Sequence, residues 1–63
     1  MREKVKTAKN MAQREYGVKI KIEFRREGFD IFVDEPIYYK AQGRMVRQIE
    51  EILGQESVEL YVM

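Results

Sequence analysis

The chain has 63 residues, of which 37% are charged, with 12 Lys or Arg against 11 Asp or Glu and neither Cys nor His. A chain this short forms one domain, residues 1–63, and buries only about 60% of its unfolded surface. Without Cys or His there is no disulfide and no typical zinc ligand set, so neither a metal nor another cofactor is expected. Small domains that lack such supports are often stabilised by self-association.

The sequence contains no signal for membrane insertion. No run approaches the ~18 apolar residues of a membrane span, and the basic N-terminal stretch MREKVKTAKN is followed by no apolar segment. We therefore expect a cytoplasmic protein with no membrane partner. Many charged residues beside a single Ser, Thr and Asn are typical of proteins from hot environments.

Charge is distributed unevenly along the chain. Residues 1–26 carry nine Lys or Arg and three Glu, whereas residues 27–63 carry three Lys or Arg and eight Asp or Glu. Such asymmetry is typical of proteins that bind nucleic acid or an oppositely charged partner. Alternatively, the two halves neutralise each other across the fold.

Residues 2–16 are predicted to form the first helix. Val5, Ala8, Ala12 and Tyr16 recur at the spacing of one helical face, and Gly17 suits the left-handed residue that ends a helix. Three cations fall on one outward face of this helix and could contact phosphates: Arg2, Lys6 and Lys9.

Residues 18–33 alternate apolar and polar side chains in two runs, which predicts a β-hairpin around Arg25–Gly28. The side chains expected on its buried face are Val18, Ile20, Ile22, Phe24, Phe29, Ile31 and Val33. Two registers keep apolar residues opposite each other. A four-residue loop pairs Phe24 with Phe29, and a two-residue loop, Glu27-Gly28, pairs Phe24 with Ile31. The longer loop is favoured because the shorter one strains Glu27.

Pro36 ends the second strand, and a second helix is predicted from about Tyr38 to Leu53. Its apolar stripe consists of Ala41, Met45, Val46, Ile49, Ile52 and Leu53. Gly43 inside the helix suggests close approach to another element. Of the two tyrosines at its start, Tyr38 and Tyr39, one is expected in the core and the other half-exposed.

A third strand is predicted at Ser57–Val62, with Val58, Leu60 and Val62 on one face and Glu59, Tyr61 and Met63 on the other. The chain is thus an α+β domain with element order α-β-β-α-β. We expect sheet order 1-2-3, with strands 2 and 3 parallel through a right-handed crossover and both helices on one face. The alternative order, 2-1-3, would be wholly antiparallel. The element order resembles a ferredoxin-like fold without its first strand, a likeness of architecture that implies no function.

The sheet face left open by the helices is the expected binding surface. Phe32, Tyr61 and Met63 form an apolar patch there, which favours association with another protein, first of all a second copy in a homodimer, through this face or a sheet edge. The alternative is nucleic-acid binding, with Phe32 and Tyr61 stacking on bases. The side chains that could then contact phosphates are Arg2, Lys6, Lys9, Lys19, Lys21, Arg25 and Arg26.

No enzymatic activity is expected, because His and Cys, the commonest acid–base and thiol groups, are missing. Asp30 and Asp34 share a strand face but lie roughly 13 Å apart, too far for a catalytic pair. The neighbouring Glu50 and Glu51 are expected to face solvent.

Overall fold

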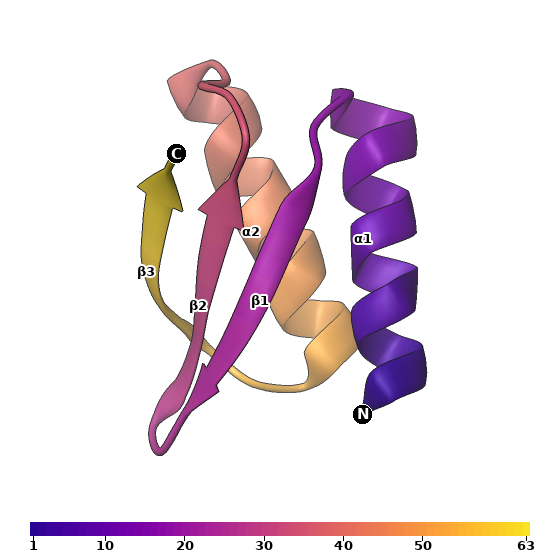
Figure 1. Cartoon of the computed structure of the whole chain (residues 1–63), viewed down its shortest axis with the longest axis vertical. Coiled ribbons are helices and arrows are strands. Elements are labelled where there is room, and N and C mark those ends of the chain that lie inside the picture. Colours follow the sequence, from indigo (N-terminus) through magenta and orange to yellow (C-terminus); the bar gives the residue numbers. More distant parts are fainter.

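The computed structural model describes all 63 residues as a three-stranded sheet with two helices packed on one face (Figure 1). The elements in chain order are α1 (Arg2–Tyr16), β1 (Ile20–Arg25), β2 (Gly28–Val33), α2 (Tyr39–Leu53) and β3 (Ser57–Val62). The elements follow the predicted order α-β-β-α-β. Neither helix is long and apolar enough to cross a membrane.

The strands are ordered β1-β2-β3, with β1 and β2 antiparallel and β2 and β3 parallel. The predicted order is therefore confirmed, and the wholly antiparallel alternative is excluded. In Figure 1, α2 lies behind the sheet as the chain passes from β2 to β3, which gives the right-handed crossover. The resemblance to a ferredoxin-like fold is limited to element order. The βαβ unit of that fold is split, whereas β2 and β3 are directly paired here.

The hairpin has the register of the favoured interpretation, with Phe24 opposite Phe29. Pairing continues one step further, to Arg25 opposite Gly28, so that only Arg26 and Glu27 form the turn. No residue other than glycine has a positive φ, so Glu27 escapes the strain expected of the alternative loop.

Gly28 holds the hairpin turn against the start of β3. Its φ is 154°, and a Cβ placed there would lie 2.2 Å from the backbone oxygen of Glu56. A side chain at this position would therefore collide with backbone, which cannot move aside as a flexible side chain can. Glycine is required here by close approach as well as by conformation.

The core lies between the central strand and the two helices. Eleven buried apolar residues form it: Ala8, Met11, Ala12, Val18, Ile20, Phe29, Ile31, Val33, Met45, Ile49 and Leu53. Ten of these residues belong to the predicted apolar faces, and Met11 lies beside the predicted stripe of the first helix. Phe24 is the exception in the opposite sense, because it lies near the hairpin tip and remains 45% exposed.

Polar side chains fasten the helices to each other and to β3. The Tyr16 hydroxyl donates a hydrogen bond to Gln48 of α2, and Gln48 Nε2 donates to Glu15 Oε1 at 3.1 Å. Glu50 does not face solvent as expected, because its Oε2 accepts hydrogen bonds from the backbone N–H and the hydroxyl of Ser57, each at 2.9 Å. Glu50 thus fixes the entry into β3, whereas Glu51 is exposed.

The start of α2 differs from expectation. Tyr38 precedes the helix in extended conformation, with φ −56° and ψ 143°, and this turns its ring out of the helical phase. Ile37 packs against the core at this end instead. Tyr38 and Tyr39 are 90% and 88% exposed, so the prediction that one lies in the core and the other is half-covered is wrong.

The prediction that another element approaches α2 closely at Gly43 is also wrong. It is exposed on α2, and a Cβ placed there would meet no atom within 4 Å. Close approach of another element does not explain this glycine. Gly17 is left-handed as predicted, and its N–H donates to Gln13 O at 3.0 Å; Gly54 ends α2 in the same conformation.

Candidate functional site

The open sheet face carries the predicted aromatic pair. The rings of Phe32 and Tyr61 stack at a centroid distance of 5.0 Å with an interplanar angle of 19°. Both helices pack on one face of the sheet (Figure 1), and Phe32 alternates with the core residues Ile31 and Val33, so the two rings lie on the face that the helices leave open. Phe32 is half-buried beneath its neighbours, while Tyr61 remains 42% exposed and Met63 76% exposed. The exposed apolar surface on this face is therefore concentrated on β3.

A row of carboxylates crosses the sheet next to the rings. Glu23, Asp30 and Glu59 occupy directly opposed positions on β1, β2 and β3. Asp30 is the unexpected member, because its side chain is only 9% exposed although it faces away from the core. Arg25 Nε lies 3.1 Å from Asp30 Oδ2, while Oδ1 has no hydrogen-bond partner.

Two of the predicted cations of the open face, Lys21 and Arg25, are paired with carboxylates. Arg25 pairs with Asp30, and Lys21 Nζ lies 3.2 Å from Glu23 Oε2. The ammonium group of Lys19 forms no ion pair, but its backbone N–H donates to Asp34 Oδ1 at 3.0 Å, which places a further carboxylate beside it. With these carboxylates close by, the open face does not present a run of free positive charge.

The outer edge of β3 is the second exposed feature. Met63 N donates to Val33 O at 2.8 Å, so the N–H of Met63 points toward β2. Because backbone direction alternates along a strand, the N–H and C=O groups of Leu60 and Val62 point away from the sheet. Val62 is 49% exposed although it lies on the core side, since β3 forms the edge of the sheet (Figure 1).

A bulge separates the start of β3 from the rest. The register with β2 shifts between Phe29, opposite Ser57, and Asp30, opposite Glu59, which leaves Val58 without a partner. Val58 therefore does not continue the face of Leu60 and Val62 as predicted; its Cγ2 lies next to Gly28. Regular pairing with β2 extends from Glu59 to Val62.

The two sheet edges differ in chemistry. β1 alternates Lys21, Glu23 and Arg25 with its apolar residues, and α1 packs beside it (Figure 1). Charged side chains on an edge discourage pairing with another strand. β3 has the sequence SVELYV, with Glu59 as its one charged residue. By this criterion β3 is the unprotected edge.

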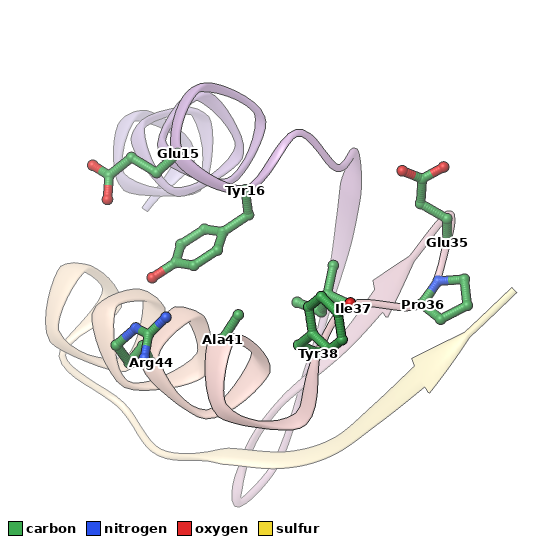
Figure 2. A pocket seen from close by; sticks show the side chains of 8 residues that line it. All are labelled: Glu15, Tyr16, Glu35, Pro36, Ile37, Tyr38, Ala41 and Arg44. Carbon is green, nitrogen blue, oxygen red and sulfur yellow. The ribbon is translucent and has the colours of Figure 1, made fainter.

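A further surface lies at the beginning of α2, where the sequence predicted no site. Two adjoining hollows occur there. One, of about 660 Å³, lies between the end of α1 and the start of α2 and is lined in part by Tyr16, Tyr38 and Arg44 (Figure 2). The other, of about 340 Å³, lies along α2 and is lined in part by Tyr39, Arg44 and Arg47. Arg44 belongs to both hollows.

The cations of this region have no carboxylate partner. Lys40, Arg44 and Arg47 are exposed, and none forms an ion pair. Residues 38–47 contain these three cations and no acidic residue, although they belong to the half of the chain with net negative charge. Counting charges over windows shorter than the two halves of the chain would have identified this segment from the sequence.

The remaining predicted phosphate contacts do not converge. Arg2, Lys6 and Lys9 are exposed on α1, in the helical layer, and Arg26 is exposed at the hairpin turn. Lys21 and Arg25 alternate along β1 with Ile20 and Ile22, which face the core, so they lie on the side of the sheet away from the helices. No group of three or more acidic residues is arranged to hold a metal ion.

Comparison with protein-family models, with curated proteins and with solved structures finds no match to this chain.

Proposed function

We propose that the chain is a small binding module that associates with a second copy of itself through the free edge of β3. The observation that carries this proposal is an edge strand with outward-facing backbone groups at Leu60 and Val62 and exposed apolar side chains on both faces. Such an edge is a template for strand addition, and antiparallel pairing across a two-fold axis would join two sheets into one.

The register of the pairing follows from backbone direction. Hydrogen-bonded partners must be residues whose backbone groups face outward, which are Leu60 and Val62. Pairing Leu60 with Val62 of the partner subunit centres the ladder on Tyr61, uses the bulge-free segment 59–63 and keeps like charges at Glu59 apart. The stack of Phe32 on Tyr61 then continues onto the same pair of rings in the second copy.

This arrangement covers the surfaces that the monomer leaves exposed. Val62, 49% exposed on the helical side, would lie against Leu60 of the partner subunit, and the two Tyr61 rings would cover each other on the open face. Five residues make a short ladder, so the interface belongs to the small class and the dimer should dissociate at about micromolar concentration.

Val62→Pro is the decisive variant. Proline removes the N–H of Val62, which points to the free edge and is not used within the monomer, and proline is tolerated on edge strands in this position. We expect sedimentation equilibrium from ~1 μM to ~1 mM to show a monomer–dimer transition for the original chain and a monomer throughout for Val62→Pro.

Val62→Thr is the matched control, because threonine keeps the N–H and favours strands. It should retain the dimer. An original chain that is monomeric at ~1 mM would refute the proposal, and a Val62→Pro dimer as tight as the original would exclude the β3 edge as the interface.

Nucleic-acid binding on the open face is less well supported. The stack of Phe32 on Tyr61 leaves fewer ring faces free for bases. The row of Glu23, Asp30 and Glu59 beside it would repel phosphates, and Lys21 and Arg25 are already paired. Affinity for single strands depends on free cations near the stacking rings.

A further inference from the structure

Gly43 lies where a glycine has no structural purpose. It is in the middle of an exposed helix surface, its φ is not positive and a Cβ would touch nothing. Glycine at such a position costs about 1 kcal/mol of helix stability relative to alanine. A residue that departs from a local rule without benefit to the fold is a pointer to function.

The absence of a side chain at Gly43 shapes the surface around it. Gly43 lines the hollow of about 340 Å³ on α2, together with Tyr39, Arg44 and Arg47. A side chain at position 43 would project into this space. The glycine therefore keeps open a hollow whose walls are an aromatic ring and two guanidinium groups.

Two tyrosine rings at the start of α2 are almost fully exposed, Tyr39 in this hollow and Tyr38 in the adjoining one. Tyr38 and Tyr39 are 90% and 88% exposed, so they contribute little to the packing of the monomer and offer both ring faces to a ligand. Lys40, Arg44 and Arg47 follow at helical spacing over roughly 10 Å of α2. None of the three has an acidic partner.

We propose that the hollow at Gly43, lined by Tyr39, Lys40, Arg44 and Arg47, forms a binding site for single-stranded nucleic acid together with Tyr38, which lines the adjoining hollow. The cations contact successive phosphates, and the tyrosine rings stack on bases. Exposed aromatic rings next to a track of free cations form the pattern by which single strands are bound without strict sequence preference. This site lies on α2, not on the β3 edge, so it does not depend on self-association.

An acidic peptide would satisfy the cations but not the rings. Two neighbouring tyrosines that are almost fully exposed match planar groups, which every base provides and few acidic side chains do. Glu15 and Glu35 line the larger hollow (Figure 2), and their carboxylates would repel phosphates as well as acidic side chains, so the anionic groups of the strand are assigned to the smaller hollow.

The test is a fluorescence anisotropy titration with labelled oligo(dT) of about a dozen nucleotides at ~50 mM and ~200 mM salt. Three phosphate contacts give a slope of about −2 in log affinity against log salt, so affinity should fall about 15- to 20-fold between the two conditions. Tyr38→Ser and Tyr39→Ser should each weaken binding at least about fivefold without changing that slope.

Two further variants separate the site from general attraction by positive charge. The double variant Arg44→Gln, Arg47→Gln should make the slope shallower by about 1.4, whereas Lys6→Gln, Lys9→Gln removes the same charge from α1 and should leave the slope nearly unchanged. Gly43→Met fills the hollow and should weaken binding while raising helix stability, a combination that damage to the fold cannot produce.

Absence of oligo(dT) binding at ~50 mM salt would overturn the proposal. Equal losses from the α1 and α2 charge variants would do the same, as would binding that is insensitive to both tyrosines. Poly-glutamate that binds as tightly as oligo(dT) and is lost in the same variants would assign the surface to an acidic protein instead. Circular dichroism of each variant confirms that the fold is intact.

Discussion

The open sheet face and the start of α2 are both rich in aromatic and charged residues, but they use them differently. On the sheet, the rings of Phe32 and Tyr61 stack on each other and Arg25 is paired with Asp30. On α2, Tyr38 and Arg44 have no such partners and are left to solvent. Similar compositions therefore serve different ends: the sheet face contributes to the fold, whereas the α2 surface is available for a ligand.

Substitution of Gly28 in the sheet and of Gly43 in α2 tests this comparison. Gly28→Ala should have the largest effect on the free energy of unfolding. The new Cβ would lie 2.2 Å from Glu56 O at a φ of 154°. Either the hairpin turn or the start of β3 must shift, and we expect a loss of about 3 kcal/mol in the free energy of unfolding, measured by urea denaturation. A loss below about 1 kcal/mol would show that the turn moves freely against β3.

The second prediction concerns the polar part of the sheet face. Arg25→Met keeps the side-chain length but removes the partner of the buried Asp30 carboxylate. Breaking a fully buried ion pair costs about 3–5 kcal/mol of unfolding free energy. Because Arg25 is 43% exposed, solvent screening reduces the expected loss, measured by urea denaturation, to about 1–2 kcal/mol.

Lys21→Met is the control for this variant. The pair of Lys21 with Glu23 is exposed at both ends, and its removal should change the unfolding free energy by less than about 0.5 kcal/mol. Equal effects of the two substitutions would contradict the view that the Asp30 pair belongs to the fold.

The same contrast explains which features the sequence could predict. Period-two and period-3.6 patterns identified all five elements, because burial of Phe29, Ile31 and Met45 determines which face of each element turns inward. Sheet order followed from the crossover rule and from the charged edge of β1. These inferences concern the core, where one pattern has one good solution.

The incorrect predictions concern positions where local backbone geometry, and not the hydrophobic pattern, determines the environment of a side chain. Tyr38 is in phase with the apolar stripe, but the helix begins one residue later and Ile37 takes the inner place. Glu50 has the composition of a surface residue, yet the chain returns so that Ser57 meets it. The bulge at Val58 likewise has no signal in the alternation, because it arises from close packing against Gly28. The exposed surface of α2 was not predicted, because the pattern placed one of its two tyrosines in the core.

Gly43→Ala tests the α2 side of the comparison and should stabilise the protein. The helical backbone accepts alanine, and its Cβ would meet no atom within 4 Å. We expect a gain of about 0.5–1 kcal/mol in unfolding free energy, opposite in sign to the effect of the same substitution at Gly28. Urea denaturation of both variants at one protein concentration gives the comparison directly. A destabilising Gly43→Ala would mean that something packs against this part of α2.

The smallest effect is expected at the two exposed tyrosines. Tyr38→Leu and Tyr39→Ser remove rings that are 90% and 88% exposed, and leucine at the N-cap position 38 adds no capping hydrogen bond, so each should change the unfolding free energy by no more than about 0.5 kcal/mol. Tyr16→Phe is the control, because the Tyr16 hydroxyl donates to Gln48 between the helices and its loss should cost about 1 kcal/mol. A near-zero effect on stability is informative here because apolar surface exposed to water gains nothing for the monomer. If either tyrosine variant cost as much as Tyr16→Phe, its ring would be part of the fold, and the distinction between a structural sheet face and a free α2 surface would fail.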